Sequence, residues 1–352
     1  MSEQTIKINH LPAPTWHWLH MNDADVSVPD ELLTYIAADE VPSGVEKTVL
    51  DAPTLGAVAT GFGKHADVIF GGVGEVTSYR TTAEVAAPVR LDYDFSEGAN
   101  SVNAIELIAP EHTEMLVIQH FHSEANGFGF AGVETKYDVA KNAKITLVQV
   151  QMLGDDMTFC NNVGGRCDDE GSFHLIQLVL GGKRTYVGSH TALSGVKSNL
   201  AVDMAYIVCD DHVLDMNYVA DHTGKKTDCV INANGVLRNQ AKKTFRGTID
   251  FKRGCAGATG AEAEDVLLMD DGVINQTIPL ILCTEEDVEG SHGATIGKLN
   301  EDLLFYMESR GMELKDIYEM MARARVDAVC NLIPDEPTRQ LVVEYLGEEE
   351  EA

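Results

Sequence analysis

Leu175-Ile176-Gln177-Leu178-Val179-Leu180 is a short apolar run of the kind that forms a buried β-strand. Similar runs recur from about residue 114 to residue 283, bounded by glycine, asparagine or aspartate, at intervals of roughly 15 to 30 residues. They lie at residues 115–118, 145–150, 199–208, 229–233, 244–251, 265–269 and 277–283. The spacing is too wide for hairpins alone, and too little helical pattern lies between the runs for βαβ units. The region therefore predicts a mainly β protein, either a parallel β-helix or a large sandwich.

The two ends of the chain carry other patterns. Within residues 1–110, the segment 31–38 suits one short helix, and glycine-rich stretches indicate tight turns. After Asn300, which suits a helix N-cap, the period becomes helical. A second helix has one apolar face, which consists of Leu314, Ile317, Met321, Ala324 and Ala328. We expect this face to pack on a first helix at 303–307. We therefore divide the chain into a mixed α/β N-terminal region (1–110), a β core (111–295) and a C-terminal helical domain (296–352).

The composition is strongly acidic. Lysine and arginine total 26 against 56 aspartate and glutamate residues, which gives a formal net charge of −30. Because phosphate backbones attract basic patches, we expect no nucleic-acid partner. The first residues lack a basic segment followed by an apolar one, and no apolar run reaches the roughly 18 residues that cross a bilayer, so we expect neither secretion nor a membrane partner. The seven cysteines include no CxxC pair, which favours a reducing, cytoplasmic location.

Familiar catalytic motifs are missing. The sequence has no GxxxxGK[ST] loop for ATP, no GxSxG elbow, no HExxH and no GxGxxG between a strand and a helix. His120, His122 and Glu124 alternate along one strand face and could form a first-row metal site of the cupin kind. That interpretation would make the chain a metal-dependent or carbohydrate-active β-helix enzyme. We favour the simpler interpretation, an exposed polar strand face.

Two further positions suit metal binding. Most cysteines are expected to be buried structural thiols, whereas Cys255 lies in a glycine-containing loop and could be an accessible thiolate. His292 stands between Gly290 and Gly293, where strands give way to helices. Glycine lets another backbone or a ligand approach closely, and neutral imidazole is a good ligand for iron. In the alternative interpretation, His292 caps the N-terminus of the helix that follows and binds no metal.

The region around His292 resembles a known family. Residues 289–299, followed by Leu304-Phe305-Tyr306 and Ser309-Arg310-Gly311, are similar to the C-terminal signature of the SufB/SufD family of iron–sulfur cluster assembly scaffold proteins. The resemblance is strong over about 215–330 and weaker back to about 110. Residues 222–224, 235–237 and 243–247 of this chain resemble core strands of the family. Residues 15–19 resemble a segment found in shorter family members.

The resemblance implies both a fold and a function. It implies a right-handed parallel β-helix (β-solenoid) flanked by an irregular N-terminal region and a C-terminal helical domain, and so decides against the sandwich. It also implies a non-enzymatic scaffold that pairs with a SufB-like chain or a second copy of itself and holds a transient iron–sulfur cluster at the dimer interface. An ABC-type ATPase, SufC, would dock on the C-terminal helices and hydrolyse ATP, which fits the missing P-loop. A cysteine desulfurase system would supply sulfur.

The resemblance assigns functional residues to this chain position by position. The SufD-type histidine falls on His292. SufB-type members have a glutamate just after this histidine, where Gly293 stands here, and a cluster-building cysteine where Glu264 stands here, so the chain is more SufD-like. We expect His292 to ligate iron, with Cys255, Glu264 and Glu289 as supporting ligands or sulfur-relay groups.

The resemblance also places ATPase docking on the C-terminal helices. We expect a second apolar stripe, formed by Ile333, Leu341, Val342 and Tyr345, to be free for another chain. The expected docking residues are Phe305, Tyr306, Arg310, Leu341, Val342 and Tyr345.

Overall fold

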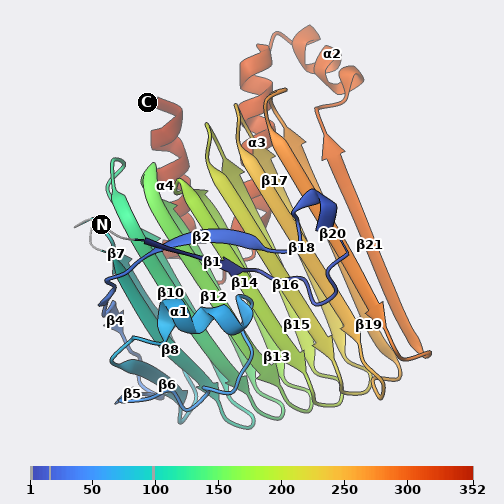
Figure 1. The fold of residues 1–352 in the computed structure, drawn as a ribbon. Coiled ribbons are helices and arrows are strands. Elements are labelled where there is room, and N and C mark those ends of the chain that lie inside the picture. The colour runs from blue at the N-terminus through green and yellow to red at the C-terminus, as the bar shows by residue number, and fades with distance from the viewer. Residues whose placement is uncertain (1–2, 16, 97–99, 352) are drawn as a thin grey trace.

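The computed structural model describes residues 3–15, 17–96 and 100–351, and consists mainly of two β-sheets that face each other (Figure 1). The first, which we call the even sheet, contains β6 (Val76–Thr81), β8 (Ser101–Ala109), β10 (Phe128–Val139), β12 (Asp156–Cys167), β14 (Arg184–Leu193), β16 (Val213–His222), β18 (Lys242–Phe251) and β20 (Ile274–Cys283). The second, the odd sheet, contains β7 (Val89–Asp94), β9 (Glu114–His122), β11 (Lys144–Leu153), β13 (Ser172–Gly181), β15 (Asn199–Val208), β17 (Asp228–Leu237), β19 (Ala258–Leu268) and β21 (Val288–Gly297).

The chain alternates between the two sheets, so that each turn adds one strand to each. Neighbouring strands from β6 to β20 and from β7 to β21 are parallel. The prediction of a parallel β-solenoid is therefore confirmed, and the sandwich alternative is wrong. Because β6, β7 and β8 already belong to the parallel ladders, the solenoid reaches further toward the N-terminus than residue 111.

The helix expected at 31–38 does not form. This segment instead supplies two short strands, β3 (Leu33–Thr34), which pairs with β8, and β4 (Ala38–Glu40), which pairs with β7. β5 (Val45–Leu50) pairs antiparallel with β6 in the same region. The backbone groups of these strands find partners at the N-terminal end of the sheets, and such non-local pairing outweighs a weak local helical pattern.

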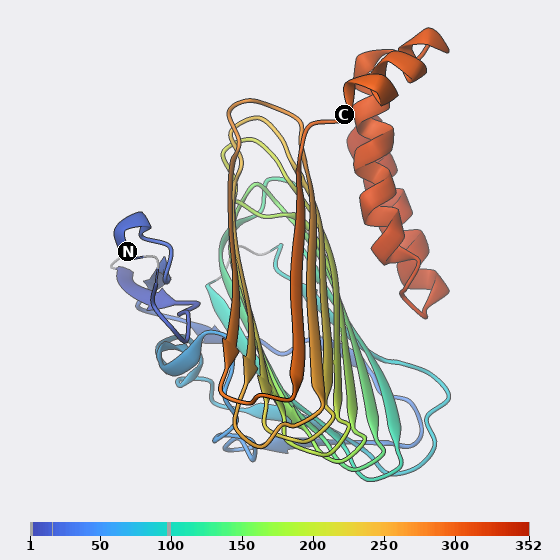
Figure 2. The ribbon, with the colours of Figure 1, turned by 90° about the vertical axis from the view of Figure 1, so that its right-hand side faces the viewer.

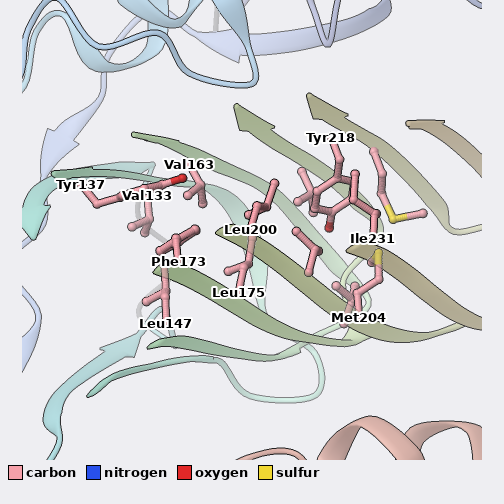
Figure 3. Packing of buried hydrophobic residues seen from close by; sticks show 14 of the residues in the cluster. Val133, Tyr137, Leu147, Val163, Phe173, Leu175, Leu200, Met204, Tyr218 and Ile231 are labelled. Carbon is pink, nitrogen blue, oxygen red and sulfur yellow. The ribbon is translucent and has the colours of Figure 1, made fainter. Parts of the chain in front are cut away.

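A continuous apolar core fills the space between the sheets. Side chains alternate along each strand, and every second one points inward. Residues in register form columns that run along the solenoid, and one column on the odd sheet consists of Val117, Leu147, Leu175, Val202 and Ile231. Figure 3 shows members of both sheets, such as Leu175 and Tyr218, projecting into this shared layer.

The corners repeat a backbone conformation. Where an even strand passes to the next odd strand, one residue has a left-handed backbone, with φ of 62° at His112, 55° at Asn142, 54° at Glu170, 59° at Lys197 and 56° at Lys226. The N–H of each of these residues donates to a carbonyl in the corner of the following turn, as His112 does to Lys141 (3.1 Å) and Asn142 to Asp169 (2.9 Å). The stacked corners therefore continue the hydrogen bonding of the sheets.

An N-terminal arm covers the outer face of the even sheet. It contains the hairpin β1 (Glu3–Ile8) and β2 (Ala24–Pro29), the short 3₁₀ turns η1 (His17–Leu19) and η2 (Gly63–His65), and the helix α1 (Ala66–Phe70) (Figure 1). Arg246 of β18 fixes the arm, because its buried guanidinium donates to the carbonyls of Met21 (2.7 Å) and Asp23 (2.9 Å) and to the carboxylate of Asp215 (2.6 Å).

Two helices, α3 (Leu314–Cys330) and α4 (Glu336–Glu351), cover the outer face of the odd sheet, and α2 (Glu301–Ser309) packs on α3 beyond the ends of the strands (Figure 2). Of the apolar face expected on α3, Leu314, Ala324 and Ala328 are exposed, because the helix turns Ala322, Val326 and Val329 inward instead. The stripe that we expected to be free is covered by the chain's own sheet. Ile333 and Val342 are fully buried against β11 and β13, Leu341 packs beside them, and Tyr345 donates to the carbonyl of Leu180 (3.2 Å). Among the described residues, no helix is long and apolar enough to cross a membrane.

Candidate functional site at the open end of the solenoid

The C-terminal end of the solenoid is open. Among the described strands, β20 and β21 are the last of their sheets, so each has one backbone edge that no described strand pairs with (Figure 2). In β19 the inward-facing residues are mostly buried, whereas every residue of β21 from Glu289 to Ile296 is exposed. The inner face of the last turn is therefore accessible, unlike the inner faces of the turns below it.

His292 lies on this accessible inner face. It is in register with Glu262 of β19, and Glu262 continues the apolar column that ends with Ile231. The imidazole is exposed, and the described residues provide it with no hydrogen bond or ion pair. The alternative of a helix-capping histidine is wrong, because His292 lies within β21 and the side chain of Asn300 caps α2 by accepting from the N–H of Asp302 (2.7 Å).

Glu264 lies two residues further along β19, also facing inward, and is buried. It forms an ion pair with the buried ammonium of Lys243 and accepts a hydrogen bond from Thr277 (2.7 Å). Burial lowers the pKa of Lys243, and the neighbouring Glu264 carboxylate opposes this shift. The carboxylate expected to ligate iron is thus already the counter-ion of a lysine.

Glu262 is the group that the sequence analysis missed. Its side chain is 5% exposed, and its carboxyl group occupies space that the absent side chain of Gly247 leaves on the opposite sheet. Burial, followed by the nearby charge of Glu264, raises the pKa of Glu262 to about 8, and Lys243 offsets only part of this. The available signal was the alternation of Glu262 and Glu264, which places both carboxylates on one face of a strand.

The other two expected ligands do not join this face. Cys255 is fully buried in the core at the corner before β19, and burial raises the pKa of its thiol, so the expectation of an accessible thiolate is wrong. Glu289 is exposed but pairs with Thr259, three positions before His292, and therefore points to the opposite face of β21. A different cysteine, Cys283, is exposed at the end of β20 in the column that contains Phe251.

The histidines of the alternative enzyme site, His120 and His122, contact other side chains and do not form a shared site. His120 lies under α4, where a ring nitrogen contacts Thr338 Oγ1 (3.3 Å), and burial lowers its pKa. His122 pairs with Asp92 (3.2 Å), and Glu124 lies beyond the end of β9. Across residues 3–15, 17–96 and 100–351, no three histidine, cysteine or acidic side chains are grouped so that they could hold a metal ion.

Comparison with known proteins decides the family. The model of the family described as "SUF system FeS cluster assembly, SufBD core domain" matches residues 94–325, about two thirds of the chain. This chain belongs to the SufB/SufD family. Among similar proteins, the iron–sulfur cluster assembly protein SufD of Escherichia coli K12 is 24% identical over 239 residues, which is 68% of this chain and 56% of that protein. SufD of Bacillus subtilis 168 is 22% identical over 291 residues, which is 80% of this chain and 65% of that protein.

A SufB protein is also similar, over a shorter segment. SufB of Bacillus subtilis 168 is 28% identical over 115 residues, which is 33% of this chain and 25% of that protein. The longer matches to SufD agree with the SufD-like pattern of His292 and Gly293. The matched segments cover only about half to two thirds of the SufD relatives.

The family signature beyond His292 forms an exposed patch on α2. Phe305 is 75% exposed and Tyr306 is 55% exposed, and the guanidinium of Arg310 lies 5.2 Å from the centre of the Tyr306 ring. Aromatic rings and arginine in such an arrangement are typical anchors of protein interfaces. Of the docking residues expected from the resemblance, these three are accessible, whereas Val342 is buried and Leu341 and Tyr345 are partly covered.

Proposed function

We propose that this chain is a scaffold subunit for iron–sulfur cluster assembly and that clusters are built at the open end of its solenoid. The observation that carries the proposal is the position of His292, an exposed imidazole on the inner face of the last strand in a chain of a cluster-assembly family. Neutral imidazole is a good ligand for iron. The cluster is cargo, which the scaffold holds and passes on, and the chain is not itself an enzyme.

A second chain would complete the site. The edges of β20 and β21 can each accept a further strand, so a SufB-like chain or a second copy of this one would continue both sheets across the interface. His292 then lies between the two chains, where ligands from both can meet. This arrangement accounts for an incomplete ligand set within one copy.

The remaining partners follow from the same assignment. An ABC-type ATPase of the SufC class would bind the patch of Phe305, Tyr306 and Arg310, and a cysteine desulfurase system would supply sulfur. The free thiols of all seven cysteines support a reducing location such as the cytoplasm. Substituting Phe305 and Tyr306 together with aspartate should abolish ATPase binding in a pull-down, since interface anchors typically contribute about 2 kcal/mol or more each. A folded double variant that still binds the ATPase would refute this docking site.

Reconstitution tests the central proposal. The full chain is combined anaerobically with candidate SufB-like and ATPase partners, ferrous iron and a desulfurase, and the intact mass and visible absorbance are recorded. His292→Ala should lose the cluster absorbance while its circular dichroism and melting curve stay unchanged, because the side chain is exposed. Glu289→Ala is the matched control, since it alters the opposite face of the same strand. Normal cluster assembly on His292→Ala, or none on the wild-type chain, would refute the proposal.

A further inference from the structure

One inward-facing column of the odd sheet changes character at its C-terminal end. It is apolar through Leu175, Val202 and Ile231, and then continues with Glu262 and His292. A carboxyl group that replaces an aliphatic side chain at a buried position loses its hydration, and this costs stability unless a partner compensates. The change coincides with the end of the column at which β21 is exposed to solvent.

Glu262 is compensated only in part by the protein. Lys243, the nearest buried cation, is bound to Glu264 and Thr277. Among the described residues, Glu262 forms no hydrogen bond and no ion pair. Its carboxyl group fits because Gly247 has no side chain there, and a Cβ at that position would lie 2.0 Å from Glu262 Oε2. The last two turns therefore place one buried carboxyl group, without a hydrogen bond or a direct ion pair, beneath one exposed imidazole.

We propose that Glu262 and His292 together form a half-site for a divalent metal ion at the open end of the solenoid. The proposal rests on the proposed function for the identity of the ion as iron, and on the geometry for the choice of residues. Parallel neighbours lie about 4.8 Å apart, a separation that one metal ion can bridge. Carboxylate and imidazole are the ligand types that bind first-row divalent metals, and a bound cation would stabilise the ionised form of Glu262, which burial disfavours.

The geometry also separates the roles of the two glutamates. Glu264 is held in a direct ion pair by Lys243 and is not free to bind metal, whereas Glu262 forms no direct ion pair with any described residue. Two ligands from one chain leave the coordination of the ion incomplete, so the remaining positions are open to a cluster sulfide or to the partner chain.

Cobalt(II) is a suitable probe, because it reports its ligands spectroscopically in the absence of cluster chemistry. The full chain, alone and with each reconstituted partner, is titrated with cobalt(II), and the visible bands and the metal-induced rise in melting temperature are measured. Glu262→Gln should weaken cobalt binding at least tenfold, as should His292→Ala. Glu289→Gln, on the opposite face of the same strand, should bind like the wild type. Failure of the wild-type chain to bind cobalt in any of these states overturns the proposal.

A second variant gives a positive signal that a purely structural role of Glu262 cannot produce. Glu262→Cys should create a thiolate-to-cobalt charge-transfer band in the near ultraviolet, because the new thiolate would contact the ion directly. A folded Glu262→Cys variant without this band overturns the proposal. If clusters assemble normally on Glu262→Gln and the cysteine variant shows no band, the scaffold function stands and the half-site is wrong. If the band appears but the wild-type chain never assembles a cluster, the half-site stands and the scaffold function is wrong.

Discussion

Lowering the pH should destabilise the solenoid through His222, the last residue of β16. The ring is buried between the sheets, where Nδ1 contacts Thr227 Oγ1 (2.7 Å) and Nε2 contacts Cys229 Sγ (3.2 Å). Burial lowers its pKa from 6.5 to about 4, and the opposing charges of Asp228 and Asp221 reduce this shift only partly. The folded state therefore holds a neutral imidazole, whereas the unfolded chain takes up a proton near its ordinary pKa.

The sign and size of the effect follow from these two pKa values. Between about pH 6.5 and pH 4 the unfolded state binds more protons than the folded state, so the free energy of unfolding falls as the pH falls. At pH 7 nearly all of this contribution is retained. At pH 4.5 the linkage relation gives a loss of about 2 kcal/mol from this one residue.

Urea unfolding at pH 7 and pH 4.5 measures this loss in the wild type and in His222→Gln, which cannot titrate. The substitution itself changes stability at both pH values, so the relevant quantity is the difference between the two pH responses. The wild type should lose about 2 kcal/mol more than the variant. His112→Gln, at an exposed corner, is the control and should respond like the wild type. Equal losses in the wild type and His222→Gln would refute the assignment of a neutral, buried imidazole.

Two further predictions test the layers on either side of the solenoid. Arg246→Met should cost about 3 to 5 kcal/mol, because it leaves the buried Asp215 carboxylate without its cationic partner and releases the arm at Met21. Denaturant unfolding and limited proteolysis of the arm measure this, and a fully protected arm would contradict it. Ile333→Ala should cost about 2 to 5 kcal/mol because its side chain is fully buried under the helices, whereas Phe305→Ala should change stability by less than about 0.5 kcal/mol. Equal melting temperatures for these two variants would show that the helical layer is packed differently.

The strands were predictable because their signal is local. Alternating or continuous apolar runs such as 145–150 and 175–180 correspond to parts of β11 and β13. The repeat that stacks them was not visible, because each corner depends on backbone conformation and backbone hydrogen bonds. Residues as different as His112, Glu170 and Lys197 occupy equivalent left-handed positions. A non-glycine residue there costs roughly 1 to 2 kcal/mol in isolation, and the stacked corner bonds help to offset it.

Two of the structural expectations that failed did so because each depended on a distant partner. The pattern at 31–38 is compatible with a helix, but β7 and β8 offer this segment backbone pairing. The apolar stripe that includes Ile333 and Val342 was correctly recognised as needing a surface, and the outer face of β11 and β13 supplies it. An amphipathic pattern indicates that a face will be buried, but not which surface buries it.

A local sequence pattern does not show which distant residues face a side chain, and this explains why His292 was identified from the sequence and Glu262 was not. Inside the solenoid, polar residues satisfy one another across the turns, as where Gln149 donates to Gln119 (2.6 Å) and Gln177 donates to Gln149 (2.6 Å). Glu264 follows this rule through Lys243, and Glu262 departs from it because the register places Gly247 opposite to it while Lys243 is paired directly with Glu264. No local pattern distinguishes two glutamates that share one face of a strand. The register distinguishes them, and it places the carboxyl group without a hydrogen-bond partner one strand below the end at which the solenoid opens. A buried polar group without a partner is costly wherever it lies, so its occurrence at this end favours a role in binding over a role in folding.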